Sequence, residues 1–560
     1  MQKHPYSSGR LPYSWGAVGD YWPRRLFHIN TKTSIERNGS QSYTDPNGNV
    51  HMRPQYSILS YTWGRFEIKQ GPSLEVRGTS WKIPAIDPDH FTVSSFEKVV
   101  DRLAEDGIQW AWIDIACIDQ ENEEVKADEI GRQAAIFQHA ERAFVWLSSL
   151  DARVSTETVS NIIEDSLEIR RHLDRWNAES ALAVKNLVTR LDSALKIFFG
   201  DMWFSSLWTL QEIVMRKDAL ALSRDGDSVP WDDKFPMFFT MFINHCQNIY
   251  QDLQALGNQR HQPKWIDSFT AQSLDDPDED TIACIDNIKK LILSAGFYYL
   301  FSENPNVQYG TAQFRKTRDA PDRIYGIMQI YNVKVGKPAR PHESPNLETL
   351  EIEFGAAINA HCPILGQSYV HTVKDLPHNT WCITQMSTVP DQLMSYQEPH
   401  KQCSISANPM GIATAHGKCC PFPDLVRVHV DLRFQLEDQT LELFLDHCIS
   451  SKLTCCPNRL RPAIQEDEIR CFPGLYERYG RQNLWVLLLG DVRGSFNYEQ
   501  RAYDRTHIGL LIGRDKWYAE EEWIGSPFHR YGVCTWLEPT ERVKREMERL
   551  QWRDVELSLI

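Results

Sequence analysis

A tryptophan and a glutamate four residues apart are the strongest candidates for chemistry in this sequence. Trp208 and Glu212 lie in a run that predicts a helix, where a spacing of four places both side chains on one face. Apolar walls beside such a carboxylate raise its pKa or hold a flat base, and the ionised carboxylate can stabilise a developing sugar cation. The alternative is that Trp208 is a core residue and Glu212 pairs with an arginine. Spacing alone favours this alternative.

A second group of polar residues begins at the end of an apolar run. Asp114 closes a predicted strand, and a buried carboxylate needs a partner, so we expect a polar site there that is structural or functional. Asp119 and Gln120 lie just before the N-terminus of the next helix. They are candidate site residues, but an alternative role for Asp119 is to cap that helix. Cys117 lies in the same loop without an assigned base, which favours a packed thiol over a catalytic one.

Other motifs argue against whole classes of chemistry. The sequence has no G-x-x-x-x-G-K-[ST] motif, so it lacks the phosphate-binding loop of ATPases and GTPases. His416 with Cys419 and Cys420, and the pair Cys455 and Cys456, lack the C-x2-C spacing of a zinc site. We therefore expect ordinary thiols and no metal.

The candidate residues lie in a succession of strands and helices with the spacing of βαβ units. Strands are predicted at 56–61, 110–115 and 143–147. The first helix between them has a capping-box pattern from Ser94 to Glu97, and the second runs to about Arg142. Such units form a parallel sheet with helices on both faces. Ligands bind beyond the carboxyl ends of such strands. Ligand-binding residues are therefore expected in 60–64, in 114–120 and in the segment after the third strand.

The whole chain divides into four predicted parts. These are an N-terminal arm at 1–52, an α/β domain at 53–220 with a helical insertion at 151–200, a mainly helical region at 221–400 and a β-rich region at 401–560. An exposed acidic loop is expected at 275–280. Alternating apolar residues from Val426 to Leu436 predict the first strand of an antiparallel β module, which a helix containing Val543 and Leu550 would close.

Composition narrows the function classes further. The 560 residues carry 60 Lys and Arg against 75 Asp and Glu, a net charge of −15 that disfavours non-specific binding to nucleic acid or to an anionic membrane. No uncharged stretch is long enough to span a bilayer, and the first residues lack the apolar region of a secretory signal. We therefore expect a cytoplasmic protein whose 13 cysteines are mostly free thiols.

Three blocks of the sequence resemble, in order, the signature blocks of the fungal heterokaryon incompatibility (HET) domain. They are Tyr56-x-Ile58-Leu-Ser-Tyr61-x-Trp63-Gly64, Trp112-Ile-Asp114-Ile-Ala-Cys117-Ile-Asp119-Gln120 and Trp208-Thr-Leu-Gln211-Glu212. The resemblance covers about 56–215 firmly and the rest loosely, through 319–326 and 530–536. This sequence departs from the family pattern at Ser206, where a basic residue is usual, and at Ile58, where alanine is usual.

The resemblance implies a protein of fungal non-self recognition and programmed cell death, responding to an allelic or non-allelic protein trigger. HET domains are regarded as distant relatives of TIR domains, which implies a TIR-like, flavodoxin-like sheet and self-association. Many TIR enzymes cleave NAD at the nicotinamide–ribose bond without a metal, through the glutamate of a Trp-x-x-x-Glu pattern. The resemblance therefore makes Glu212 the expected catalytic residue and a small nucleotide such as NAD a substrate rather than a cofactor. The substrate-binding residues it implies are Tyr61, Trp63, Gly64, Asp114, Cys117, Asp119, Gln120, Trp208 and Gln211.

Three hypotheses follow. The first is a cell-death effector that hydrolyses NAD or a related nucleotide. The second is a non-enzymatic, self-assembling signalling module with the β-rich region as its sensor. The third is a HET scaffold recruited to small-molecule metabolism, with Asp114, Cys117 and Glu212 lining a different pocket.

Overall fold

The computed structural model forms two compact units. It describes residues 22–39, 41–104, 107–174, 178–258, 278–372, 380–390, 393–394, 396–408, 411–433, 441–446, 473–497, 502–514, 527–537 and 550–560. The N-terminal unit comprises Met1–Phe301, Phe314–Asn332 and Gly336–Ser344, and the C-terminal unit comprises Ser302–Gln313, Val333–Val335 and Pro345–Ile560.

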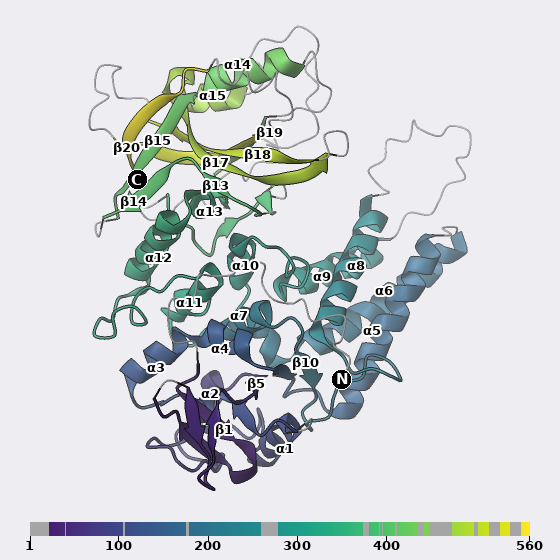
Figure 1. Cartoon of the computed structure of the whole chain (residues 1–560). Coiled ribbons are helices and arrows are strands. Elements are labelled where there is room, and N and C mark those ends of the chain that lie inside the picture. The colour runs from purple at the N-terminus through teal and green to yellow at the C-terminus, as the bar shows by residue number, and fades with distance from the viewer. Residues whose placement is uncertain are drawn as a thin grey trace. The chain divides into compact units, whose positions relative to one another are not determined.

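A six-stranded sheet organises the N-terminal unit (Figure 1). Its strands, in spatial order, are β10 (Leu220–Leu222), β9 (Arg142–Trp146), β5 (Tyr56–Ser60), β8 (Trp110–Trp112), β1 (Arg25–His28) and β2 (Thr33–Glu36). The first four are mutually parallel, and β1 pairs antiparallel with both β8 and β2. In chain order the parallel strands β5, β8, β9 and β10 are therefore arranged 2-1-3-4 across the sheet. The predicted parallel sheet is confirmed, with an antiparallel edge added.

The antiparallel edge comes from the segment predicted to be a loose arm. Within its described residues, Arg25–His28 joins the main sheet, and Phe27 faces Ala111 of β8 in the register. Leu26 and Phe27 are fully buried, so these residues belong to the core. A smaller hairpin, β3 (Ser42–Thr44) and β4 (Val50–Met52), follows. Short apolar strands next to polar turns carry little periodic signal, which is why the sequence did not reveal them.

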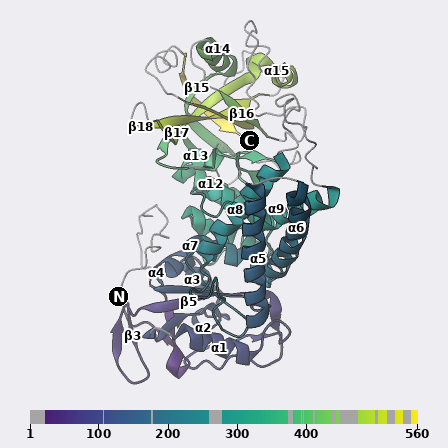
Figure 2. The same cartoon turned by 90° about the vertical axis from the view of Figure 1, so that its right-hand side faces the viewer.

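Helices lie on opposite sides of the main sheet. In Figures 1 and 2, α1 (Val93–Leu103) lies on one side, and α4 (Gln133–His139) and α7 (Leu207–Met215) lie on the other. The predicted capping box at Ser94 is wrong by two residues, because the Thr92 hydroxyl caps α1 and exchanges hydrogen bonds with Ser95.

Two other predicted elements are shorter than the sequence suggested. The strand at 110–115 ends at Trp112, because Asp114–Cys117 forms the single helical turn α2. The helix predicted to run to Arg142 is divided into α3 (Glu123–Ile130) and α4. Gly131 ends α3, and an added Cβ there would lie 3.1 Å from Pro338.

The helical insertion is a pair of long helices, as predicted. α5 (Ala152–Leu173) and α6 (Ala178–Phe199) lie side by side (Figure 2). Arg190 of α6 pairs with the buried carboxylate of Asp165 of α5 at 2.8 Å. α8 (Phe239–Asn258) packs against α5, and α9 (Glu279–Ser294) packs against α6. The expected acidic loop is partly wrong, because Asp278 caps α9 and its side chain accepts from Thr281; residues 275–277 lie outside the described residues.

The chain returns to the N-terminal unit at Phe314–Asn332 and again at Gly336–Ser344, which together we call the return segment. This return segment contains α11 (Asp322–Tyr325) and η6 (Met328–Tyr331). Gln329 accepts from the backbone N–H of Ala134 at 2.6 Å and also donates to the carbonyl of Ile130, so it joins the ends of α3 and α4. Residues distant in sequence thereby hold α4, the helix that packs against α7.

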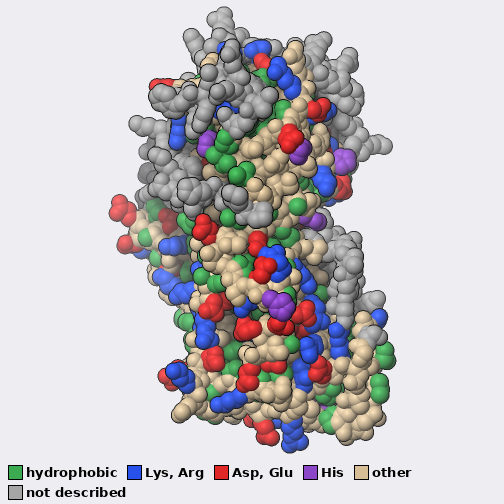
Figure 3. Space-filling model, turned by 90° about the vertical axis from the view of Figure 1, so that its left-hand side faces the viewer, with side chains coloured by type: hydrophobic (Ala, Val, Ile, Leu, Met, Phe, Trp, Pro, Cys, Tyr) green, Lys and Arg blue, Asp and Glu red, His purple; other side chains and the backbone are tan. Residues whose placement is uncertain are grey.

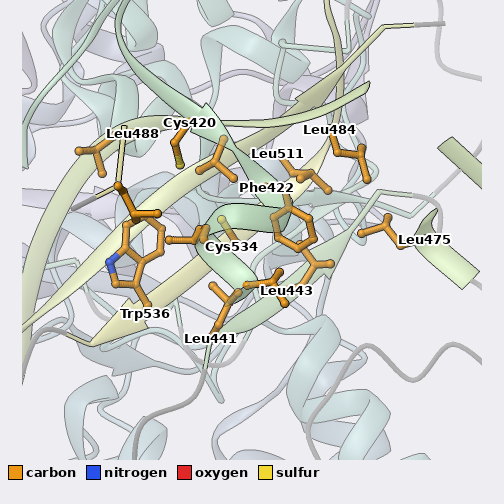
Figure 4. Close-up of a cluster of buried hydrophobic side chains, with 14 of the residues drawn as sticks. Cys420, Phe422, Leu441, Leu443, Leu475, Leu484, Leu488, Leu511, Cys534 and Trp536 are labelled. Carbon is orange, nitrogen blue, oxygen red and sulfur yellow. The ribbon is translucent and has the colours of Figure 1, made fainter. Parts of the chain in front are cut away.

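The C-terminal unit is built on an antiparallel sheet, which confirms the predicted β-rich region. Its strands are β13 (His400–Lys401), β14 (Ser404–Ala407), β15 (Ala413–Pro421), β16 (Glu442–Leu445), β17 (Leu484–Asn497), β18 (Ala502–Gly513), β19 (His529–Leu537) and β20 (Arg553–Leu559). Figure 4 shows its apolar core, in which Phe422, Leu511, Cys534 and Trp536 lie together.

The strand predicted from Val426 is wrong, because Phe422–Arg433 forms the helix α14. Phe422, Leu425, Val426 and His429 are buried, which is the spacing of one helical face. The alternation of valines mimicked a strand by coincidence. Of the predicted closing helix, Val543 lies outside the described residues, and the prediction is wrong at Leu550, which lies in a bend just before β20.

The remaining described elements are short or lie between the two sheets in sequence. In the N-terminal unit these are η1 (Ile29–Thr31), η2 (Gly64–Phe66), β6 (Glu67–Ile68), β7 (Ala85–Ile86) and η4 (Met202–Ser205). In the C-terminal unit they are α10 (Pro305–Ala312), α12 (Leu347–His361), α13 (Pro363–Gln367), β11 (Val370–His371), β12 (Ser387–Thr388), α15 (Pro473–Tyr479) and η9 (Arg481–Asn483). No helix in the described part of the chain is both long and apolar enough to cross a membrane.

Candidate functional site

Glu212 lies on α7, where its carboxyl group reaches the carboxyl end of the central strand β5. Ser60, the last residue of β5, donates from its hydroxyl to Glu212 Oε2 at 2.5 Å. Gln133 of α4 donates from Nε2 to Glu212 Oε1 at 3.1 Å. Both carboxyl oxygens are therefore held by neutral side chains, and no arginine pairs with Glu212 in the described structure. Among the described residues, the contacts of Glu212 are thus not those of the alternative in which it pairs with an arginine.

Burial makes this carboxyl group an unusually weak acid. Glu212 is only 8% exposed, and the loss of hydration raises its pKa to about 8. The hydrogen bond from Ser60 lowers this pKa, and the nearby negative charge of Asp114 raises it. At neutral pH the closed site thus favours the protonated form of Glu212.

Ser60 is itself held from a third element. Trp203, in η4 directly before α7, donates from its indole Nε1 to Ser60 Oγ at 2.8 Å. The indole is fully buried. Trp203 and Ser60 therefore form a chain of hydrogen bonds that fixes the orientation of the Glu212 carboxyl group. Neither residue was predicted as a site residue, although Ser60 lies inside the first signature block.

Asp114 forms a second carboxylate centre at the same edge of the sheet. Trp63 donates from Nε1 to Asp114 Oδ2 at 2.6 Å, and the backbone N–H of Ile115 donates to Oδ1 at 2.7 Å. Burial raises the pKa of Asp114, and the hydrogen bond from Trp63 opposes this shift. The structure thus joins two of the predicted residues directly and brings Asp114 close enough to Glu212 to affect its pKa.

Trp208 meets a carboxylate that sequence spacing did not predict. Its indole Nε1 donates to Asp322 Oδ2 at 3.4 Å, from α7 to α11 of the return segment. Burial raises the pKa of Asp322 to about 6. Trp208 is partly exposed and therefore does not have the fully buried position expected of a core residue. The resemblance of residues 319–326 to full-length family members was the available signal for Asp322.

A buried arginine from the return segment fixes the start of α7. Arg315 is 1% exposed and donates to the carbonyl oxygens of Trp203, Ser206 and Ala295 at 3.2, 3.3 and 2.6 Å. Burial lowers its pKa to about 9. Its three acceptors are backbone carbonyls, so its role is to hold the η4–α7 turn rather than to form an ion pair.

The other predicted residues divide into buried and loop positions. Tyr61 packs against Phe96 and Trp146, and burial, together with the nearby Asp114, raises the pKa of its hydroxyl. Gln211 is 1% exposed, and neither atom of its amide group has a hydrogen-bond partner among the described residues.

The loop residues have structural contacts. Asp119 accepts from the backbone N–H groups of Glu121 and Asn122, while Asn122 rather than Asp119 caps α3. Gln120 donates to the carbonyl oxygens of Asp114 and Ile118. Gly64 has no left-handed φ, and an added Cβ there would have no heavy atom within 4 Å, so its position does not require glycine.

Cys117 is buried, and burial raises its pKa to about 12, which agrees with a packed thiol rather than a nucleophile. All nine cysteines in the described part of the chain are free, as the sequence predicted. No group of three or more His, Cys, Asp and Glu residues in that part is arranged to hold a metal ion.

The surface is mixed in charge. On the face that Figure 3 shows, acidic and basic side chains are interspersed. Elsewhere in the structure, Lys337 of the return segment pairs with Glu123 of α3 at 3.1 Å. The face seen in Figure 3 therefore has no broad basic surface.

These contacts define a class of site: buried carboxyl groups beside indole rings, at the carboxyl edge of a parallel α/β sheet. Glu212 and Asp114 come from different elements and have pKa values raised by burial, which is the pattern of acid–base and charge-stabilising centres. The position agrees with the general rule for ligand sites in open α/β sheets.

Comparison with known proteins identifies the family. Residues 56–212 match the family model described as Heterokaryon incompatibility protein (HET), and this stretch of the chain is therefore a HET domain. The match begins at β5 and ends at Glu212. It supports a heterokaryon incompatibility-type function. No curated protein and no solved structure shows detectable similarity to the chain.

Proposed function

We propose that this HET-domain protein is a cytoplasmic cell-death effector of non-self recognition, which hydrolyses NAD or a related nucleotide at the nicotinamide–ribose bond through Glu212. The observation that carries the proposal is the Glu212 carboxyl group, held by Ser60 and Gln133 at the carboxyl end of the central strand. The 2-1-3-4 order of the parallel strands supports it, because flavodoxin-like sheets share this order and bind nucleotides at that edge.

The reaction needs the ionised form of Glu212. As the bond between ribose C1′ and the pyridinium nitrogen breaks, its electron pair leaves with neutral nicotinamide and positive charge develops on the ribose. The Glu212 carboxylate stabilises this charge, water attacks C1′, and the proton released passes to the carboxylate or to solvent. A cationic nicotinamide ring close to Glu212 lowers its pKa, so substrate binding itself favours the reactive form.

Substrate access requires a change at the site. Both oxygens of Glu212 accept internal hydrogen bonds, and Glu212 lines neither a cavity of about 110 Å³ beside α1 nor one of about 410 Å³ beside α5 and α6. Release of Ser60 or Gln133 would free one oxygen. We propose that self-association or a protein trigger promotes this change.

Incubation of the purified full-length protein with NAD, with nicotinamide measured by chromatography, tests the function. Wild-type protein should release nicotinamide under conditions that promote assembly. Glu212→Gln should lower the rate at least 100-fold, because one charge-stabilising group contributes about 10²–10³ in rate. The matched control is Glu157→Gln on α5, where the side chain is exposed. Absence of release from wild type, with equal toxicity of wild type and Glu212→Gln in cells, would reject the proposal.

A non-enzymatic, self-assembling module is the second candidate. This second candidate is favoured because both oxygens of the Glu212 carboxyl group are already hydrogen-bonded within the protein. A carboxyl group with a purely structural role does not have to be reached by a substrate. Toxicity that depends on oligomer formation and survives both Glu212→Gln and Asp114→Asn would support this candidate. The high pKa of Cys117 argues against a role for its thiol in a recruited metabolic enzyme.

A further inference from the structure

Arg65 lies in η2, in the loop that follows the central strand β5, and its side chain is half-buried. Its Nη2 group donates to the carbonyl oxygen of Met202 at 3.3 Å and to Ser205 Oγ at 2.9 Å, both in η4. No carboxylate among the described residues pairs with this guanidinium group. Burial lowers the pKa of Arg65, and no nearby acidic group offsets that shift. A partly buried cation without a counter-charge is costly, so this position favours an anion.

Arg224 reaches the same edge of the sheet from the end of β10. It lies two residues after Leu222, the last residue of that strand, and its side chain is exposed. Its Nε group donates to the carbonyl oxygen of Ser148 at 2.8 Å, and its Nη2 group donates to that of Ser149 at 3.0 Å. Both acceptors are neutral, and in the described part of the chain no carboxylate pairs with Arg224. It is therefore a second cation without an ion-pair partner at this edge.

The contacts of the two arginines meet at one turn. Asp201, the N-cap of η4, accepts from the backbone N–H of Ser149 at 2.7 Å, which joins the segment that Arg65 contacts to the segment that Arg224 contacts. Burial lowers the pKa of His90, and the positive charges of Arg65 and Arg224 lower it further. Both guanidinium groups are therefore close to the same imidazole ring.

The carboxylate inside this group of residues is already used. Asp201 is 1% exposed. One of its oxygens accepts from the backbone N–H of Trp203 at 2.8 Å, and the other accepts from that of Ser149. Asp201 consequently forms no ion pair with either arginine.

The two arginines are connected to the Glu212 site through η4. This element also carries Trp203, whose indole donates to Ser60, which in turn donates to Glu212. Arg65 and Arg224 both follow parallel strands of the main sheet, at the edge where open α/β sheets bind ligands.

We propose that Arg65 and Arg224 form an anion site that binds a phosphate or diphosphate group. Nε and Nη1 of Arg65 and Nη1 of Arg224 make no hydrogen bond with the described residues. Guanidinium groups match phosphate oxygens in paired hydrogen bonds, and two of them balance the charge of a phosphate group. This ligand class follows from the two arginines alone. That the phosphate groups belong to the substrate at Glu212 rests on the proposed function.

Isothermal titration calorimetry of the full-length protein at low salt tests the site without any turnover. The probes are inorganic pyrophosphate and ADP-ribose. Wild type should bind ADP-ribose, and Arg65→Met and Arg224→Met should each weaken binding about tenfold or more, because each removes charge-assisted hydrogen bonds. Arg77→Met is the matched control and should leave binding unchanged. Arg77 is 73% exposed and lies beside β2, at the opposite edge of the sheet from β10.

The two probes distinguish the sources of the phosphate group. Tighter binding of ADP-ribose than of pyrophosphate assigns the site to a nucleotide, and equal binding assigns it to a free inorganic anion. Arg224→Met covers the case in which Arg65→Met fails to fold, because the Arg224 side chain is exposed. No binding of either probe to wild type, or equal binding to wild type and to every arginine variant that folds, overturns the site.

The anion site and the proposed function fail in different ways. Probe binding that the arginine variants weaken, without NAD turnover by wild type, upholds the site and rejects the function. NAD turnover with an unchanged KM in both variants upholds the function and overturns the assignment of the site to the substrate.

Discussion

At the scale of single residues, Glu212 combines a position suited to chemistry with an environment that keeps it neutral. Ser60 and Gln133 hold its two oxygens, and Trp203 holds Ser60. Each partner is neutral, so the cost of ionising a buried carboxyl group is only partly offset. The consequence is a pKa of about 8, well above the usual value of 4.5.

This raised pKa predicts that wild-type stability falls as pH increases. Between pH 4.5 and 8 the folded state binds the Glu212 proton more tightly than the unfolded state, so the contribution is complete below pH 4.5 and is lost as pH rises through 8. The loss is roughly 4–5 kcal/mol at about 1.4 kcal/mol per pH unit. Glu212→Gln imitates the protonated carboxyl group and should lack this loss.

Urea unfolding of wild type and Glu212→Gln at pH 5 and pH 9 measures the effect. The two proteins should be similar at pH 5, and the variant should be the more stable one at pH 9. A wild-type stability advantage that grows towards pH 9 would contradict the raised pKa.

At the scale of elements, the start of α7 depends on a segment that lies far away in sequence. Arg315 crosslinks the carbonyl groups of Trp203 and Ser206 to that of Ala295, and Lys316 continues the contact by donating its N–H to Ser205 at 2.7 Å. The η4–α7 turn therefore has its position set by the return segment. The Trp203 indole and Glu212 lie on either side of this turn.

Two arginines three residues apart provide a matched test of this arrangement. Arg315→Met should lower stability by about 3 kcal/mol, because it leaves buried carbonyl groups without donors. Arg318→Met removes only an exposed pair with Glu67 and a bond to Gly64, so the expected loss is within about 1 kcal/mol. Differential scanning calorimetry measures both. Equal losses of stability in the two variants would show that the buried hydrogen bonds of Arg315 contribute no more to stability than the exposed contacts of Arg318.

At the scale of the whole molecule, the matched stretch 56–212 is smaller than the unit that folds around it. The main sheet also uses β1 and β10, and the return segment supports α4 and α7. The signature blocks therefore contain the candidate site and do not mark the boundaries of the structural unit.

Two truncated forms of the protein test whether the folding unit is larger than the matched stretch 56–212. Residues 56–212 alone should be unfolded or insoluble, because β8 would lose its neighbour β1 and β9 would lose its neighbour β10. Residues 22–344 retain the complete sheet and the return segment and should fold. Far-UV circular dichroism with urea titration compares the two. Cooperative unfolding of 56–212 alone would contradict the prediction.

The sequence alone determined the local elements with strong patterns and the identity of the site region. Apolar runs such as β5 and β17 and long periodic helices such as α5 follow from hydrophobic spacing, and the signature blocks singled out Asp114, Trp208 and Glu212. The sequence does not predict the antiparallel edge β1–β2, because strands this short carry little hydrophobic periodicity. It predicts a strand in place of α14, because the valines there alternate with polar residues.

Only the tertiary structure decided what these residues contact. Spacing placed Trp208 and Glu212 on one helix face, yet it did not show that Ser60 and Gln133 hold the glutamate or that Asp322 meets the indole. Those partners are 79 to 152 residues away in sequence. The pKa of a carboxyl group depends on burial and on charges brought near by folding, so the chemistry of Glu212 is a property of the packed sheet edge.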